Sequence, residues 1–573
     1  MKDFLHLMKN LKKDFSGLKK VKAAVLGDTS TQFLVQALRG TGYEKGYDLE
    51  VWEADYNQIE QQIFSNDSLL YKFNPEIVIV FRSSHKLLGK YNKLKPEYYH
   101  QLATDEMKAI DSIYMTLSTQ LNAKVIFYNY AEIDDTVFGS FANKTESSFI
   151  FQLRKLNYEL TNYALKNPDF FICDLSAIQN RTGRTSLFQP SVYINSEMIL
   201  SIDVLPEIAY RTIDIIGALY GKSKKCVILD LDNTTWGGVI GDDGIENIQL
   251  GHLGIGKAFT EFQYWIKKLK NRGILIAICS KNTESIAKEP FEKHPDMILQ
   301  LEDIAVFVAN WGNKVDNIIH IQRILNIGFD SMVFLDDNPF ERNLVRENLP
   351  DICVPELPED PADYLEYLYS LNLFETISFS AEDTERTKQY QDEARRSIFQ
   401  QNFSNGEDYL KSLQMKSLVE PFNKFNIPRV AQLSQRSNQF NLRTVRYTQA
   451  DAESLSQSPE HYTFTFTLED KFGDNGLISV VVLHKETKDT LFIENWFMSC
   501  RVLKRGMEQF TLNVIAGFAA DQGFKILKGE YILTAKNDLV RNHYEELGFQ
   551  KREDYWILEI PAYKNLKTVI ENK

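Results

Sequence analysis

The sequence predicts a multidomain protein with two α/β domains followed by an α+β domain. The chain has 573 residues, which is several times the length of roughly 150 residues that is typical of one domain. Through residue 356, short apolar runs alternate with amphipathic helical stretches, a pattern typical of parallel sheets flanked by helices. After residue 405, several extended runs follow one another before a helix, which indicates a mixed sheet.

These patterns divide the chain into four segments. Residues 1–221 open with a β-turn-α pattern at 21–40 and form the first α/β domain, and residues 222–356 repeat the pattern with sharper strands. Residues 357–404 are highly charged with helical periodicity and read as a helical connector. Residues 405–573 form the α+β domain.

The bulk composition argues against several classes of function. A net charge of −13 gives no positive field that would attract nucleic acid or an anionic membrane, so a phosphorylated metabolite must be held by a local site. No apolar stretch of about 18 residues or signal peptide is present, and we expect a cytoplasmic location. The cysteines show no paired spacing and are expected to be reduced thiols: Cys173, Cys226, Cys279, Cys353 and Cys500.

Two carboxylates lie at the end of the apolar run 226–232. If the strand continues through Asp230 and Asp232, its period of two places both on one side. Two like charges so close require a cation, and Mg²⁺ prefers oxygen ligands, which Asp336 and Asp337 at the end of another strand can supply. One Asp could attack phosphorus while the other acts as general acid and base. A DxD sequence at a strand end can also be only a turn cap.

Two further segments favour the catalytic interpretation. Ser280 ends a strand and is followed by Lys281, which together offer a hydroxyl and donors for a phosphate oxygen. Lys314 precedes a helix and can neutralise charge on the nucleophile and the phosphoryl group. Taken alone, such a Ser is usually a helix cap and such a Lys a solvated residue. Their order between DLDNT and FLDDNPFE makes coincidence a poor explanation.

These four motifs resemble those of the haloacid dehalogenase (HAD) superfamily over about residues 222–355, with a Rossmann-like parallel sheet. The resemblance implies that Asp230 is the nucleophile, Asp232 the general acid/base, Ser280 the phosphate-binding hydroxyl and Lys314 the motif-three lysine. It implies phosphatase or phosphotransferase chemistry. It also implies a Mg²⁺ site formed by the Asp230 side chain, the Asp232 backbone carbonyl, and Asp337 with Asp336 in support.

The longer string DLDNTTWGGVIGDDGIENIQLG, with ICSKN, NWGNK and FLDDNPFERN, resembles the FkbH-like branch, HAD subfamily IIIC. The segments 437–448, 472–482 and 497–509 also fit this branch. The resemblance implies transfer of a glyceryl unit from an acyl phosphate to an acyl carrier protein, with loss of phosphate. Phosphatase activity on a small phosphorylated or acyl-phosphate substrate is the more general expectation.

The C-terminal segment resembles a GNAT-type acyltransferase. The resemblance rests on the RVLKRG loop from Arg501 to Gly506, and on Asn537 and Tyr544 in NDLVRNHYEELGF, and implies that these four residues bind a cofactor. Lys504 replaces the first loop glycine, and its Cβ stands where a pyrophosphate needs close approach to the backbone. Coenzyme A or phosphopantetheine binding is therefore disfavoured relative to a structural or carrier-docking role.

The N-terminal GDTSTQFL resembles the first block of SGNH hydrolases within a flavodoxin-like domain. Asp28 matches this block, Thr29 replaces the nucleophilic Ser, and Asn129 fits a later block. No His occurs between His100 and His252, so the usual late catalytic His is missing. We expect a non-catalytic scaffold or lid.

A thioester role for Cys279 and two other functions of the chain are alternatives to the phosphatase. An acyl-thioester on Cys279 would suit transfer to a carrier thiol, but strand alternation points this side chain away from Ser280 and into the core. The first alternative is a non-enzymatic assembly module with a vestigial HAD site, which the intact motifs oppose. The second is a GNAT acyltransferase, which Lys504 opposes.

Overall fold

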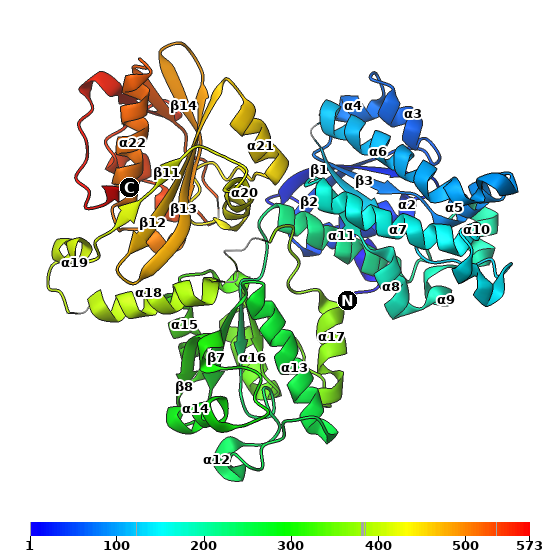
Figure 1. Cartoon of the computed structure of the whole chain (residues 1–573), viewed down its shortest axis with the longest axis horizontal. Coiled ribbons are helices and arrows are strands. Elements are labelled where there is room, and N and C mark those ends of the chain that lie inside the picture. Colours follow the sequence, from blue (N-terminus) through cyan, green and yellow to red (C-terminus); the bar gives the residue numbers. More distant parts are fainter. Residues whose placement is uncertain (1, 122, 380–382, 384, 401, 535) are drawn as a thin grey trace. The chain divides into compact units, whose positions relative to one another are not determined.

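The computed structural model describes residues 2–121, 123–379, 383, 385–400, 402–534 and 536–573. The chain divides into two compact units, residues 1–217 and 218–573. The first contains one sheet and the second contains two (Figure 1). Both sheets of the first 356 residues are parallel and the last sheet is mixed, so the predicted fold class is confirmed.

The first unit is built on a parallel sheet in the order β2-β1-β3-β4-β5. Its strands are β1 (Lys19–Gly27), β2 (Tyr47–Glu53), β3 (Ile77–Phe81), β4 (Lys124–Tyr128) and β5 (Phe170–Cys173). The chain leaves β1 for β2 on one side and returns to β3 on the other. In such a sheet, a crevice opens at the carboxyl ends of the two strands where the direction reverses. The first unit therefore has a natural ligand position between β1 and β3.

Helices connect the strands of the first unit. Their bounds are α1 (Phe4–Asn10), α2 (Gln32–Glu44), α3 (Ile59–Phe64), α4 (Leu69–Phe73), α5 (Ser84–Tyr91), α6 (Leu102–Leu121), α7 (Phe149–Lys166), α8 (Leu175–Thr182), α9 (Arg184–Leu187), α10 (Pro190–Ser196) and α11 (Leu205–Leu219). Ser83, Ser148 and Asp174 cap α5, α7 and α8, each accepting a hydrogen bond from a backbone N–H of the first turn. These caps fix where the helices begin after the strand ends.

The second unit begins with a parallel sheet in the order β8-β7-β6-β9. Its strands are β6 (Cys226–Leu229), β7 (Leu275–Ser280), β8 (Ile304–Ala309) and β9 (Met332–Leu335). Alternate residues enter two separate cores: Val227 and Leu229 pack on one face, Cys226 and Ile228 on the other. Burial of both faces explains why these strands are almost entirely apolar in sequence.

Helices cover both faces of this sheet (Figure 1). Their bounds are α12 (Ile240–Asp243), α13 (Gly254–Asn271), α14 (Glu284–Lys293), α15 (Lys314–Leu325), α16 (Pro339–Asn348), α17 (Tyr364–Leu371) and α18 (Arg386–Gln400). Tyr364 and Leu368 of α17 belong to the core around α13, and Tyr390 of α18 to the opposite core. The predicted connector thus contributes to the packing of the domain before it. Residues 380–382, 384 and 401 of that prediction lie outside the described residues.

A mixed sheet follows, with the order β16-β17-β15-β14-β13-β12-β10-β18 and β11 beside β12. Its strands are β10 (Lys416–Ser417), β11 (Val419–Glu420), β12 (His461–Asp470), β13 (Gly473–Lys485), β14 (Thr490–Met498), β15 (Ile526–Gly529), β16 (Gln550–Arg552), β17 (Tyr555–Glu559) and β18 (Glu571–Asn572). Its helices are α19 (Gly406–Ser412), α20 (Ile427–Arg436), α21 (Gln449–Gln457), α22 (Met507–Asp521) and α23 (His543–Glu546). The predicted long strands and the helix before 522 are present.

A buried ion pair joins α18 to the mixed sheet. The Arg396 guanidinium donates from Nε and Nη2 to the two carboxylate oxygens of Asp470, at 2.7 and 2.9 Å. Both side chains are almost completely buried, and each has a second ionic partner: Arg396 also pairs with Glu393, and Asp470 with Arg505. Within the described residues, no helix combines the length and apolarity that crossing a membrane requires.

Candidate active site

The candidate active site lies where the chain reverses direction in the four-stranded sheet. The chain moves from β6 to β7 and β8 on one side and returns to β9 on the other. Asp230 follows β6 directly, and Asp336 and Asp337 follow β9. The Asp230 N–H donates to the Leu335 carbonyl at 3.0 Å, which holds the two strand ends side by side. Carboxyl ends of parallel strands at such a reversal are the usual position of a ligand.

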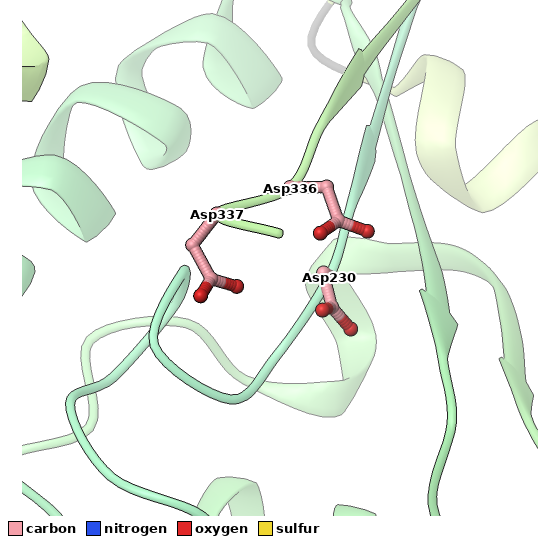
Figure 2. Close-up of side chains that lie close together, drawn as sticks. All are labelled: Asp230, Asp336 and Asp337. Carbon is pink, nitrogen blue, oxygen red and sulfur yellow. The ribbon is translucent and has the colours of Figure 1, made fainter. Parts of the chain in front are cut away.

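Three carboxylates converge at this position. One ligand oxygen from each of Asp230, Asp336 and Asp337 lies within 4.8 Å of the others. Figure 2 shows the three side chains together. Burial, and then the charge of Asp230, raise the pKa of Asp336 to about 7 and also raise the pKa of Asp337. The protein alone therefore disfavours full ionisation of the cluster. A hard divalent cation with oxygen ligands would offset this repulsion, so the donor set fits Mg²⁺.

Lys314 contacts two members of this cluster. Its Nζ lies 2.8 Å from Asp230 Oδ2 and 2.6 Å from Asp336 Oδ2, and the side chain is buried. Burial alone would lower the pKa of Lys314, but Asp230 and Asp336 outweigh it and raise the pKa. Lys314 is therefore a permanent cation beside the candidate nucleophile. Its place at the start of α15, after the Asn313 cap, fixes where the side chain points.

Asp232 occupies a different position from the one that strand alternation predicts. β6 ends at Leu229, so neither aspartate is part of a regular strand. The Asp232 carboxylate is not a member of the three-carboxylate cluster. Its Oδ1 accepts from Trp236 Nε1 and the Ile240 N–H, both at 3.0 Å, and its Oδ2 accepts from Asn282 Nδ2 at 3.2 Å. Burial raises its pKa, which favours the protonated form that a general acid needs.

The remaining predicted residues lie on the neighbouring strand end. Ser280 is the last residue of β7 and is buried. Lys281 follows it, and its ammonium group pairs with Glu341 Oε1 of α16 at 2.5 Å. Cys279 is fully buried in the apolar core, with Sγ 3.8 Å from the Lys314 carbonyl oxygen. Burial raises the pKa of its thiol to about 12, which leaves almost no thiolate for nucleophilic attack.

Three residues that the motif analysis did not assign to the site support its side chains. Thr234 Oγ1 accepts from the Asp337 N–H at 2.9 Å and donates to Asp337 Oδ1 at 3.2 Å. The buried Arg342 donates from Nη1 to the carbonyls of Asp336 and Asp337 at 2.8 and 2.6 Å. Asn282 supports Asp232, as described above. The sequence signal for Arg342 was its place in FLDDNPFERN, but only the fold reveals its carbonyl partners.

The four residues proposed for a cofactor in the C-terminal domain do not surround one cavity. A cavity of about 430 Å³ lies beside Gly506, which is in the left-handed region with φ 84°. Arg501 lines a different pocket and hydrogen-bonds Ser499 and Gln389. Asn537 is buried and donates to the carbonyls of Asn441 and Ile532, and the buried Tyr544 ring packs on Gly529. Of the four, only Gly506 borders the cavity.

Comparison with known proteins identifies relatives over the two α/β segments. The family model described as FkbH, N-terminal domain, matches residues 22–217. The crystallised N-terminal part of the protein BF1531 from Bacteroides fragilis, containing a phosphatase domain complexed with Mg, is 59% identical. The match covers 66% of this chain and 100% of that chain, with a TM-score of 0.64. No curated protein sequence matches the chain.

The C-terminal part is similar to small acetyltransferases at low identity. The ribosomal-protein-S18-alanine N-acetyltransferase from Escherichia coli is 18% identical over 26% of this chain and 99% of its own, with a TM-score of 0.21. The GNAT domain of S. lividans PAT is 16% identical over 25% of this chain and 88% of that chain, with a TM-score of 0.20.

Because the whole crystallised Bacteroides segment aligns with this chain at 59% identity and the N-terminal model also matches, the chain belongs to the FkbH-like family.

Proposed function

We propose that this chain is a Mg²⁺-dependent HAD-type phosphatase or phosphotransferase that acts through an aspartyl-phosphate on Asp230. The observation that carries the proposal is the convergence of Asp230, Asp336 and Asp337 with Lys314 at the carboxyl end of the sheet. The 59% identical Bacteroides protein, whose phosphatase domain is complexed with Mg, supports it. The substrate we propose is a small phosphorylated metabolite or an acyl phosphate.

The metal would be held by carboxylate oxygens of Asp230, Asp336 and Asp337, with the Asp232 backbone carbonyl as a further ligand. When bound, Mg²⁺ supplies positive charge that neutralises the carboxylates and the phosphoryl oxygens. The residues of the chain set the arrangement around it. Asp336 is bound at Oδ2 by Lys314 and at Oδ1 by the Asn338 N–H, at 2.6 and 2.9 Å. Asp337 is held only at Oδ1 by Thr234, which leaves its Oδ2 the more available oxygen among the described contacts.

In the first step, a carboxylate oxygen of Asp230 attacks the phosphorus of the substrate. A bond forms between this oxygen and phosphorus, and the bond from phosphorus to the leaving oxygen breaks. Asp232 donates its proton to that leaving oxygen, and the raised pKa of its carboxyl group favours the protonated form before this step. Lys314 stabilises the negative charge that collects on the phosphoryl oxygens.

In the second step, water or another acceptor attacks the phosphorus of the aspartyl-phosphate. Asp232, now ionised, accepts the proton of the attacking hydroxyl, while the bond from phosphorus to the Asp230 oxygen breaks. Asn282 Nδ2 donates to Asp232 Oδ2 at 3.2 Å and so stabilises the ionised carboxylate between the steps. The products are inorganic phosphate and regenerated Asp230, or a phosphorylated acceptor.

The phosphate group of the substrate would be bound by the Ser280 hydroxyl, Lys281 and Lys314. Ser280 and Lys314 are both buried, so each contact is made in a medium of low dielectric, where it is stronger than in water. Lys281 is partly exposed and is paired with Glu341. A phosphate at the site would therefore share this ammonium with the Glu341 carboxylate.

The test is a phosphate-release screen over small phosphorylated metabolites and acyl phosphates, with and without Mg²⁺. We expect Mg²⁺-dependent release by the unmodified chain and none by Asp230→Asn, which is nearly isosteric. Asp242→Asn, an exposed residue of α12, is the matched control and should release phosphate normally. Undiminished release by Asp230→Asn would refute the nucleophile. An inactive chain that still bound a carrier protein would instead support the assembly-module alternative.

A second proposal couples phosphate loss to transfer of a glyceryl or acyl group onto an acyl carrier protein. The observation that favours it is the cavity of about 430 Å³ beside Gly506. Coenzyme A fits this cavity poorly. The Lys504 N–H already donates to Glu508 Oε1 at 3.0 Å and is not available to a pyrophosphate, and the wall carries the carboxylates of Glu508 and Glu546 as well as the ammonium groups of Lys504 and Lys567.

Filling the cavity separates the two activities. Leu539 lines it and is 57% exposed, so Leu539→Trp should reduce acylation of a carrier thiol while phosphate release from a small substrate persists. Leu533→Trp is the matched control, because Leu533 is equally exposed and is absent from the cavity lining. Equal carrier acylation by both variants would place the acceptor elsewhere.

A further inference from the structure

The first unit contains a cavity at the reversal point of its own sheet. β1 and β3 are neighbours whose connections run to opposite sides, and a cavity of about 110 Å³ lies at their carboxyl ends. Its wall includes Asp28 after β1, Arg82 and Ser83 after β3, and Lys86 and Lys90 of α5. This is the position at which open α/β sheets bind ligands. The phosphatase proposal makes no use of it.

Asp28 leaves one oxygen without a partner at this cavity. Its Oδ2 accepts from the Ser83 N–H at 2.9 Å, whereas its Oδ1 is buried and has no hydrogen-bond partner among the described residues. Burial raises the pKa of Asp28 to about 7, against the lowering effects of the Ser83 N–H and of Arg82 and Lys86. A buried acceptor left unsatisfied typically costs about 1–3 kcal/mol. Such a cost is common at a site that a ligand completes.

The opposite wall is a fixed array of charges. Glu106 is almost fully buried and receives Arg82 Nε at 2.7 Å, Lys90 Nζ at 2.9 Å and the Tyr130 hydroxyl at 2.9 Å. One carboxylate thus serves two cations. Lys86 pairs with Glu197, but both side chains are at least one third exposed, so this pair is weak and can be exchanged for a ligand anion. Arg82 Nη1 also pairs with Glu60 at 2.7 Å, so Lys86, whose partner is the most readily exchanged, is the cation most available to a ligand anion.

The arrangement is suited to binding rather than to hydrolysis. Thr29, at the position of the SGNH nucleophile, is completely buried, and it is absent from the cavity lining. An ammonium group would add a fourth cation beside Arg82, Lys86 and Lys90. A hydroxyl can donate to Asp28 Oδ1 without this repulsion, and an anionic group a few bonds away would satisfy the lysines.

We propose that the β1–β3 crevice of the first unit binds a small hydroxylated anion, with the ligand hydroxyl donating to Asp28 Oδ1 and the ligand anion held by Lys86 and Lys90. An engineered apolar cavity of roughly 150 Å³ holds benzene. On that scale, the crevice of about 110 Å³ accommodates a hydroxy acid of lactate size. This site lies outside the phosphatase motifs, so its test is independent of the proposed catalytic function.

Three probes with one carbon skeleton isolate the predicted contacts. Lactate carries a hydroxyl beside its carboxylate, propionate lacks the donor, and alanine replaces the hydroxyl with an ammonium group. Saturation-transfer NMR titrations on the full chain measure the affinity of each. Above pH 7, where Asp28 is ionised, we expect saturable lactate binding, with propionate and alanine weaker by about tenfold or more, because a hydrogen bond to a charged acceptor contributes about 1.5–3 kcal/mol.

Variants connect the binding to the named residues. Asp28→Asn keeps an oxygen for the Ser83 N–H and should weaken lactate about tenfold, to the level of propionate. Lys86→Gln should weaken lactate and propionate together and leave their ratio unchanged. Asp67→Asn, an exposed residue bonded to Ser65, is the control and should bind as the unmodified chain does. Thermal unfolding verifies that each variant is folded.

Four outcomes would overturn the proposal. They are equal affinities for lactate and propionate, alanine binding more tightly than lactate, unchanged lactate affinity in a folded Asp28→Asn, and no saturable lactate signal. If Asp28→Asn does not fold, the Lys86→Gln variant still tests the proposal. Unchanged affinity for lactate and propionate in Lys86→Gln would show that they do not bind in this crevice.

Discussion

Arg342 provides a test of how the proposed metal ligands Asp336 and Asp337 are held. Its Nη1 donates to the carbonyls of Asp336 and Asp337, and its Nε and Nη2 contact Glu356. Arg342→Met retains much of the buried volume but removes every donor. The residues Asp336 and Asp337 would then lose the contact that fixes their backbone, so their carboxylates would converge less often.

The magnitude follows from the number and kind of bonds. Two hydrogen bonds from a charged donor to buried carbonyls, at about 1.5 kcal/mol each or more, predict a loss of unfolding free energy of about 3 kcal/mol. Groups that orient metal ligands typically change metal affinity 10- to 100-fold when removed. We therefore expect the Mg²⁺ concentration for half-maximal phosphate release to rise by about that factor.

Arg346 supplies the matched control. It pairs with the same Glu356 and donates to the Val354 carbonyl, but it makes no contact with the carbonyls of Asp336 and Asp337. Titrating phosphate release with Mg²⁺ in Arg342→Met and Arg346→Met compares the two. The same half-saturation in both variants, or in Arg342→Met and the unmodified chain, would show that the carbonyl contacts do not organise the metal site.

Three further predictions concern individual carboxylates. Asp232→Asn should slow turnover by about 10²- to 10⁴-fold, because proton transfer is lost. Mass spectrometry should detect residual phosphoenzyme that decays slowly. Turnover at the native rate would refute the general acid/base role of Asp232. Asp337→Ala should raise the Mg²⁺ requirement more than Asp336→Ala, because both oxygens of Asp336 already have protein partners; an equal shift in the titration would contradict this ranking. The pKa of Asp28 is raised to about 7 in the folded state, so between about pH 4 and pH 7 the folded state retains a proton that the unfolded state loses. The free energy of unfolding should therefore fall by at most about 4 kcal/mol as the pH rises through this range, and then level off. Asp28→Asn should remove this slope and be more stable than the unmodified chain at pH 8, and denaturant unfolding at several pH values measures both.

The sequence alone predicted which side chains lie together where the strands end. Runs of apolar residues followed by polar ones marked where β6, β7 and β9 end, and the parallel sheet then brought Asp230, Lys314 and Asp336 within bonding distance. This works because both faces of such strands are buried and their ends share one edge. The assignment of catalytic roles to these residues remains a prediction.

Other contacts depend on loop geometry that the pattern does not encode. Asp232 points toward Trp236 and Asn282 because the loop turns immediately after β6, with Asn233 at φ 54°. Arg342 donates to backbone carbonyl oxygens. Because every residue has a carbonyl group, no residue type in the sequence indicates these partners. In the C-terminal domain, Asn537 matched a motif, but its side chain is used to close a loop.

The reversal of chain direction occurs twice in this protein, between β1 and β3 and between β6 and β9. In both cases the routing of the backbone brings two strand ends together, and the side chains beside them belong to connecting loops and helix starts. Substitutions at these edges can alter ligand chemistry while the buried strands continue to determine stability. The two groups of strand-end residues can therefore diverge independently in evolution. The acidic residues after β6 and β9 can be kept while the charged residues after β1 and β3 are exchanged, without any change in either core.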